Sequence, residues 1–400
     1  MPKIKNILLL SPQPFFQARG TPINVREMLY ALSEDGYQVT LLCYPFGEDI
    51  KIPNVTIIRS SKPFLINDIK IGPSLSKIIL DLFFFFNALK LCFTKKFSLF
   101  HGIEEAGLIA GFLGIVFRKP FIVDVDSAMS QQLEESGFIK SKLILKMFEL
   151  SEGFFFKRAA SVITVCQSLS DEVKKLSTTA KISQIEDFAL EYKEISKSIA
   201  SLKEQFKIPN SSKIILYGGN FEPYQGIDLL LQSIKEIASK GIKNIHLVLV
   251  GGSEAHITHY RDVAQSNDIK NFVSFTGQIE SSLMGHIHDQ ADVLVSPRLT
   301  GSNTPLKIYS YMQSGRPIVA TKIYSHTQVL DDTLAYLAEA TPEDFSNKLI
   351  QATSDDPQFL AEKESKASNA KHLAENRYSR THFRKLLKEV YANIFANINE

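Results

Sequence analysis

The sequence predicts an α/β fold built from two Rossmann-like, doubly wound domains. Short apolar runs of strand length alternate with helical patterns throughout the 400-residue chain, which favours parallel sheets covered by helices on both faces. Several of these runs end in glycine-rich or polar turns. A polar stretch near the middle of the chain separates two such series, and the chain is longer than a typical single domain.

The strand candidates are apolar runs of three to five residues. In the first half they are residues 7–10, 39–43, 55–58, 99–101, 121–125 and 162–165. In the second half they are residues 214–217, 246–250, 273–275, 293–295 and 318–320. Apolar residues at helical spacing lie between several of these runs, as at 25–32, 103–116 and 227–237.

The predicted domain junction lies in residues 190–209, which are polar and end in Pro209. We therefore predict an N-terminal domain over residues 1–195 and a C-terminal domain over residues 196–378. Residues 380–398 have the pattern of one amphipathic helix, so residues 379–400 are predicted to form a closing helix.

Composition and charge exclude several classes of protein. A formal net charge of +2 provides no basic footprint for nucleic acid. Cys43, Cys92 and Cys166 lie far apart in apolar surroundings, which favours reduced thiols over a disulfide or a metal site. The first apolar run is too short for a signal peptide, so we expect a cytoplasmic protein.

The most informative segment is residues 296–320, which has the pattern strand, polar loop, helix, glycine, strand. The loop ends in Ser302, Asn303 and Thr304, whose backbone N–H groups precede a helix that starts near Pro305. A helix N-terminus attracts anions, and Lys307 adds a full positive charge in the first turn. The segment therefore predicts a site for a phosphate or a diphosphate.

Other candidate site residues also follow predicted strands, where ligands of open parallel sheets bind. Gly20 and Thr21 follow the first run, with Thr21 expected to cap a helix, and the paired glycines Gly218 and Gly219 follow the run at 214–217. A glycine there lets a ligand approach the backbone closely.

These motifs together resemble those of retaining GT-B glycosyltransferases of family 4. The resemblance covers nearly the whole chain and is most specific at residues 297–320. It implies two domains that face a cleft, with the closing helix crossing back to the first domain. It also implies transfer of a hexose-type sugar from a nucleoside diphosphate donor, with retention of configuration and without a metal ion or cofactor.

The resemblance assigns donor binding to the first glycine loop and to two segments of the second domain. These residues are Gly20, Thr21, Gly218, Gly219, Arg298, Ser302, Asn303, Thr304, Pro305, Leu306, Lys307 and Ser310. The family has glutamates where this chain has Ser302 and Ser310, and usually a lysine where this chain has Gln225. Arg298 and Lys307 are therefore expected to neutralise most of the diphosphate charge.

Asp126, His101 and Glu105 are the predicted catalytic residues. His101 and Glu105 lie at the end of one predicted strand, and Asp126 lies at the end of the next, where many family members have a histidine that contacts the transferred sugar. The Asp124-x-Asp126 spacing also matches the metal-binding motif of single-domain GT-A enzymes, but two doubly wound halves argue against that fold. Two alternatives remain open: a sugar-nucleotide epimerase with the GT-B fold, and a non-catalytic GT-B scaffold that has lost both motif glutamates.

Residues 78–93 form an aromatic-rich helix candidate that is too short and too polar to span a membrane. The four phenylalanines at 83–86 cannot all face one core, because consecutive helical positions point in different directions. The segment is either a core helix with a basic end or a surface that binds anionic lipid through Lys90, Lys95 and Lys96. We predict peripheral binding at the inner face of a membrane, with a lipid-linked or membrane-associated glycan as acceptor.

Overall fold

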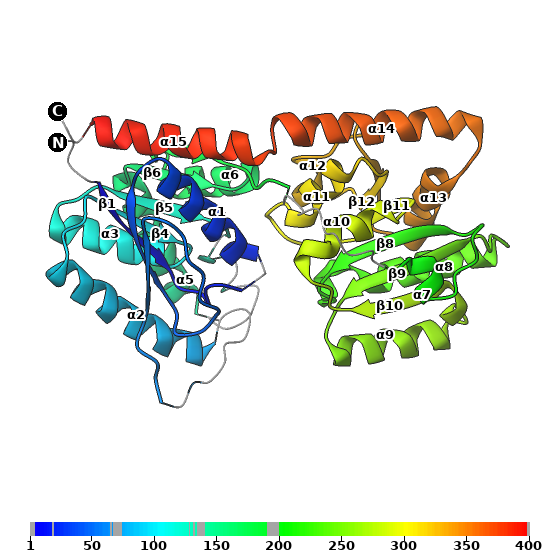
Figure 1. The fold of residues 1–400 in the computed structure, drawn as a ribbon, viewed down its shortest axis with the longest axis horizontal. Coiled ribbons are helices and arrows are strands. Elements are labelled where there is room, and N and C mark those ends of the chain that lie inside the picture. The colour runs from blue at the N-terminus through cyan, green and yellow to red at the C-terminus, as the bar shows by residue number, and fades with distance from the viewer. Residues whose placement is uncertain are drawn as a thin grey trace. The chain divides into compact units, whose positions relative to one another are not determined.

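The computed structural model describes residues 5–17, 20–64, 66, 74–127, 129–130, 133, 141–189 and 200–397 (Figure 1). The chain forms two compact α/β units. Unit 1 comprises Met1–Glu186 together with Phe383–Glu400, and unit 2 comprises Asp187–His382. The predicted fold class, two doubly wound α/β domains, is confirmed. The predicted boundary at residue 195 lies outside the described residues. The second domain was predicted to end at residue 378, and unit 2 ends at His382 in the structure.

Unit 1 contains a seven-stranded parallel sheet in the order β3-β2-β1-β4-β5-β6-β7. Its strands are β1 (Asn6–Ser11), β2 (Gln38–Cys43), β3 (Val55–Arg59), β4 (Leu99–Ile103), β5 (Phe121–Val125), β6 (Ser161–Thr164) and β7 (Ile182–Gln184). Its helices are α1 (Gly20–Glu34), α2 (Leu75–Thr94), α3 (Ala106–Phe117), α5 (Lys142–Arg158), α6 (Gln167–Leu176) and most of α15 (Arg380–Ala396). Strand order reverses beside β1, so the switch point of the sheet lies between β1 and β4.

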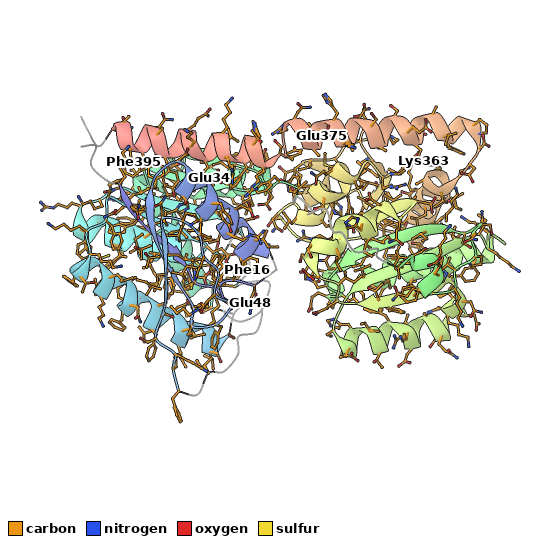
Figure 2. All side chains as sticks on the ribbon, in the orientation of Figure 1. Phe16, Glu34, Glu48, Lys363, Glu375 and Phe395 are labelled. Carbon is orange, nitrogen blue, oxygen red and sulfur yellow. The ribbon has the colours of Figure 1, made fainter. Side chains whose placement is uncertain are left out.

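The core of unit 1 explains why its strands are apolar at successive positions. One face of the sheet packs against α2, α3, α5 and α6 through residues such as Leu8, Phe84 and Phe100. The other face packs against α15, where the Tyr37 ring lies 5.5 Å from that of Phe395, and Arg384 pairs with Glu34 (Figure 2). A parallel sheet covered on both faces needs apolar side chains on both, which gives the continuous runs seen in the sequence.

Unit 2 contains a six-stranded parallel sheet in the order β10-β9-β8-β11-β12-β13. Its strands are β8 (Lys213–Gly219), β9 (Ile245–Gly251), β10 (Val273–Gly277), β11 (Val293–Ser296), β12 (Ile318–Thr321) and β13 (Tyr336–Ala338). Its α-helices are α7 (Leu202–Gln205), α8 (Ile227–Ser239), α9 (Glu254–Ser266), α10 (Met284–Asp289), α11 (Leu306–Ser314), α12 (Tyr324–Thr327), α13 (Pro342–Thr353) and α14 (Pro357–Asn376). Here β8 and β11 are neighbours, so the switch point lies between them.

Each predicted strand coincides with or overlaps an observed one, whereas β7, β13 and α14 were not predicted. Among the described residues, no helix combines the length and the hydropathy needed to cross a bilayer. Within the same ranges, no group of three or more His, Cys, Asp or Glu side chains is arranged to hold a metal ion.

Candidate functional site

The predicted anion site lies at the carboxyl edge of the unit 2 sheet, where β11 ends at Ser296 and α11 begins at Leu306. Pro305 is the N-cap of α11. The helix ends at Gly315, whose φ of 68° lies in the left-handed region that glycine adopts without strain. The turn after β8 lies at the same edge, because β8 and β11 are parallel neighbours. The structure therefore brings the predicted residues of the two segments together.

Lys307 occupies the centre of this arrangement. Its Nζ lies 3.1 Å from Oε1 of Gln225 and 4.0 Å from the centroid of the Tyr217 ring. A Cβ added to Gly219 would lie 2.9 Å from this Nζ, so a side chain at this position would displace the ammonium group from the glycine turn. Burial, and next the charge of Arg298, lower the pKa of Lys307 from 10.5 to about 7. The lysine is therefore directed at the glycine turn, and no carboxylate of the described part of the chain forms an ion pair with it, as a site for an anion requires.

Arg298 is enclosed by its own loop. Its Nε donates to the carbonyl oxygen of Thr300 at 2.7 Å, and its Nη1 and Nη2 donate to the carbonyl and side-chain oxygens of Asn303 at 2.9 and 3.1 Å. A Cβ on Gly301, which has a φ of 128°, would lie 2.0 Å from Nη2. Arg298 thus fixes the loop that precedes α11, and its charge acts on the same region as that of Lys307.

The remaining donor-site predictions lie around this loop and helix. The carbonyl oxygen of Ser302 accepts a hydrogen bond from Gln328 at 3.0 Å, and Ser310 is 5% exposed on α11. The Thr304 side chain is 3% exposed, and within the described residues its Oγ1 has no hydrogen-bond partner. A buried hydroxyl without a partner costs free energy, which a bound ligand would recover.

Sequence reasoning missed the tyrosines of this site. The hydroxyl of Tyr311 accepts a hydrogen bond from the backbone N–H of Gly218 at 3.0 Å and so ties α11 to the glycine turn. Tyr217 donates to the carbonyl oxygen of Asn220 at 2.6 Å. Tyr311 lies one helical turn after Lys307, and this i, i+4 spacing was the available signal.

His326 is a second missed residue, and it connects two strand ends. Its Nε2 lies 2.9 Å from Oγ of Ser296, and its Nδ1 lies 2.8 Å from the carbonyl oxygen of Thr321. Burial lowers the pKa of His326 to about 4, so the ring is neutral at pH 7. It therefore braces the ends of β11 and β12 and adds no positive charge to the site.

In unit 1, Gly20 and Thr21 lie at the start of α1, after β1. Gly20 has a φ of 32° and is the first residue of the helix. The prediction that Thr21 caps this helix is wrong, because Thr21 already lies in its first turn. Their donor-binding role stays a prediction.

His101 is fully buried in β4. Its Nδ1 lies 2.6 Å from the hydroxyl of Tyr391 in α15, and its Nε2 lies 3.4 Å from Oδ2 of Asp124 in β5. With no exposed surface, the ring joins two strands to α15 and offers no face to a ligand in this structure. A catalytic role for His101 stays a prediction, and the ring would have to exert it through Tyr391 or Asp124.

Glu105 and Asp126 lie at the carboxyl edge of the same sheet. Glu105 follows β4 and forms an ion pair with Lys77 of α2 at 2.6 Å. Asp126 follows β5 directly, and the next residue, Ser127, lies with its Oγ 3.5 Å from Oε1 of Glu104. The predicted acids are thus brought to one edge, with Glu104 as an additional member.

Glu104 differs from Glu105 in its backbone and its surroundings. Its φ of 52° is left-handed, which is uncommon for a residue other than glycine. Its Oε2 accepts a hydrogen bond from Gln13 at 2.7 Å. Burial, and next the charge of Glu105, raise the pKa of Glu104 above its usual range. A carboxyl group of this kind can take up a proton closer to neutral pH than an ordinary glutamate.

The fold of the chain is of the GT-B type, with two doubly wound α/β units. Residues 212–355 match the family described as glycosyl transferases group 1. The chain is similar in fold to sucrose-phosphate synthase from Thermosynechococcus elongatus, with a TM-score of 0.77, 19% identity and coverage of 98% of this chain and 100% of that one. It is also similar to Anabaena HepE in complex with UDP, with a TM-score of 0.74, 14% identity and coverage of 98% and 100%.

Two curated relatives are similar in sequence over part of the chain. Protein CapJ of Staphylococcus aureus is 23% identical over 64% of this chain and 59% of its own length. The phosphatidyl-myo-inositol mannosyltransferase of Mycobacterium leprae is 24% identical over 34% of this chain and 35% of its own length. The chain thus spans roughly a third to three fifths of these relatives. The predicted resemblance to GT-B glycosyltransferases is confirmed.

Proposed function

We propose that the protein is a retaining glycosyltransferase that moves a hexose-type sugar from a nucleoside diphosphate donor to an acceptor. The observation that carries this proposal is the position of Lys307, whose buried ammonium group faces the Gly218–Gly219 turn at the N-terminus of α11. The match of residues 212–355 to glycosyl transferases group 1 and the fold shared with a UDP complex support it.

In this proposal the residues of unit 2 stabilise the departing diphosphate. Negative charge grows on that group in the transition state, so fixed cations and backbone N–H groups placed there lower the barrier. Lys307 contributes its charge, Arg298 fixes the loop, and Thr304 offers a hydroxyl. Ser302 and Ser310 replace the two family glutamates and are proposed to bind the ribose and sugar hydroxyls. Because two cations serve the diphosphate, we expect turnover without a metal ion or cofactor and no loss of activity with EDTA.

The catalytic roles proposed in unit 1 belong to Asp126, Glu105 and His101. Asp126 would act on the transferred sugar. Glu105 would hold Lys77 through their ion pair beside Glu104, and we call Glu104, Glu105 and Asp126 the acid cluster. His101 would position Asp124 through the contact of 3.4 Å. Glu104 joins them as the group suited to receive the proton of an acceptor hydroxyl.

We propose a lipid-linked or membrane-associated glycan as the acceptor, and peripheral association with the inner face of a membrane as the location. The name of the mycobacterial relative, a phosphatidyl-myo-inositol mannosyltransferase, supports an acceptor of this kind.

A thermal-shift titration with UDP, GDP and ADP is the first test. A rise in melting temperature that is lost in Lys307→Met supports the donor site. Product analysis with the matching sugar nucleotide then separates the alternatives: transfer to an acceptor supports the proposal, an isomerised sugar nucleotide indicates the epimerase, and the absence of any nucleotide binding indicates the scaffold.

A further inference from the structure

An extended apolar face covers the outside of unit 1. Among the described residues, twenty large hydrophobic side chains are exposed, and fifteen of them lie on three helices, α2, α3 and α5. We call these fifteen the apolar face. They are Leu75, Ile78, Ile79, Leu82, Phe83, Phe86 and Phe93 of α2, Phe112, Ile115 and Val116 of α3, and Leu143, Ile144, Met147, Leu150 and Phe154 of α5. A concentration of this size marks a surface that meets another apolar phase.

The apolar face follows helical periodicity. In α2, one stripe that contains Leu80 and Phe84 is buried against the sheet, while a second stripe that contains Leu82 and Phe86 points outward. In α5, the outward positions recur at intervals of three or four residues, from Leu143 to Phe154. A helix that is apolar on both sides is normally enclosed on both sides, so the outer stripe requires a covering of its own.

The three helices form a continuous surface. The ring centroids of Phe85 in α2 and Phe112 in α3 are 5.5 Å apart. A Cβ on Gly111 of α3 would lie 2.2 Å from the ring of Phe155 in α5, so these two helices approach each other closely. In Figure 1, α2 and α3 lie next to each other on the outside of the unit 1 sheet.

One edge of the apolar face is strongly basic. Because α2, α3 and α5 each lead into a parallel strand, their C-terminal ends meet at the same edge of the sheet. The exposed cations there are Lys90, Lys95, Lys96, Arg118, Lys119, Lys157 and Arg158. No aspartate or glutamate occurs in residues 90–98, 115–121 or 153–160. Exposed apolar side chains bordered by cations are typical of surfaces that rest in the headgroup region of an anionic membrane.

We infer that the apolar face and its basic edge form the docking surface of unit 1 for an anionic lipid bilayer. No helix of the described residues is long and apolar enough to span a bilayer, so α2, α3 and α5 would lie on the membrane surface. The charge pattern favours lipid over a second copy of this chain, because two copies meeting through this face would add cations at its edge without adjacent acids to pair with them.

The docking surface also gives the acid cluster a position relative to the membrane. The first turns of α2 carry Ile78 and Ile79 on the apolar face, while Lys77 of the same turns pairs with Glu105. Asp81, one turn later, accepts a hydrogen bond from Tyr44. This end of the apolar face lies opposite the basic edge and beside the carboxyl edge of the unit 1 sheet, so a membrane-linked acceptor that reaches this end would meet Glu104, Glu105 and Asp126. This step rests on the proposed function, whereas membrane binding itself does not.

Vesicle sedimentation of the full chain tests the inference. At low salt we expect most of the wild-type protein to pellet with phosphatidylcholine vesicles that contain phosphatidylglycerol, and little to pellet with phosphatidylcholine alone. High salt should release much of it, because salt screens the interaction of exposed charges. Changing Lys95, Lys96 and Arg118 to glutamate should lower the bound fraction at least about fivefold, because each cation near an anionic surface adds to binding.

Matched variants separate the contributions. Lys240, Lys243 and Lys270 are exposed lysines of unit 2, and changing them to glutamate alters the net charge equally. This control should pellet like the wild type. Changing Leu82, Phe86 and Leu150 to asparagine should weaken binding while leaving the nucleotide thermal shift intact, because these side chains are 55%, 58% and 63% exposed.

Three outcomes would overturn the inference: wild-type protein that stays in solution, equal loss of binding in the unit 2 control, or a solution dimer that the asparagine variant dissociates. None of these measurements uses a sugar donor or an acceptor. A protein that binds vesicles but transfers no sugar would therefore refute the proposed function alone.

Discussion

The lowered pKa of Lys307 predicts that nucleoside diphosphate binding takes up a proton. At about 1.36 kcal/mol per pKa unit, the fall in pKa from 10.5 to about 7 means that the site disfavours the charged form of Lys307 by roughly 5 kcal/mol. A diphosphate beside Nζ favours the charged lysine and raises its pKa again. Below pH 7 the lysine is already protonated, so binding needs no proton. Above pH 7 each binding event must bring one.

The affinity should therefore be nearly constant below about pH 7 and fall by up to about tenfold per pH unit above it. Calorimetry at pH 8, in two buffers with different heats of ionisation, should give an uptake close to one proton per nucleotide. Lys307→Met should remove this uptake and weaken binding by about 1.5–3 kcal/mol, the range for a hydrogen bond to a charged group.

Lys307→Arg is the matched control, because arginine stays charged throughout this pH range. Its affinity should be independent of pH between about 7 and 9, even if its absolute value is lower. An unchanged wild-type affinity over that range, or equal proton uptake by wild type and Lys307→Met, would show that Lys307 does not meet the diphosphate.

Three further predictions concern single side chains. Glu104→Gln should stabilise the fold at alkaline pH, because the raised pKa of Glu104 makes its ionisation in the folded protein costly above its usual pKa. The same change should lower turnover at least about tenfold. Denaturant melts from pH 5 to 9 measure the gain in stability, and steady-state rates measure the loss of turnover. Asp126→Asn should cut turnover at least about tenfold while nucleotide affinity stays within a few-fold, and full activity would assign Asp126 to structure. Gly301→Ala should cost about 1–3 kcal/mol through its φ of 128° and its clash with Arg298, and should weaken nucleotide binding; a thermal melt and a titration with the nucleotide measure both effects.

The sheets were predictable because their strands are buried on both faces and therefore consist of continuous apolar residues. The runs at 7–10 and 214–217 identify β1 and β8 without further information. By contrast, β7 and β13 have only three residues each, too few for a periodic pattern. Helix α14 was missed because only four of its twenty residues are buried, which leaves a weak apolar stripe.

The candidate anion site was partly predictable, because the glycine turn follows β8 and the loop that leads to Lys307 follows β11. The tyrosines were not predicted, since the contact of Tyr311 with Gly218 joins residues 93 positions apart. His101 illustrates the limit most clearly. Its neighbour Phe100 faces the core shared with α2, so the alternation of side chains along β4 directs His101 to the opposite face, where Tyr391 lies. A sequence reveals that alternation but not which helix covers each face.

The hydrogen bond between His101 and Tyr391 has a consequence for how the protein is made. Unit 1 is discontinuous, since its helix α15 follows the whole of unit 2 in the chain. A ribosome that adds about 5–20 residues per second needs roughly 15 to 60 s to cover the 290 residues between the two partners. During that time the sheet face that packs on α15 lacks its cover, and His101 lacks the hydroxyl that it contacts. Unit 2 can therefore be complete before unit 1, and the first-synthesised strands are among the last to be fully enclosed.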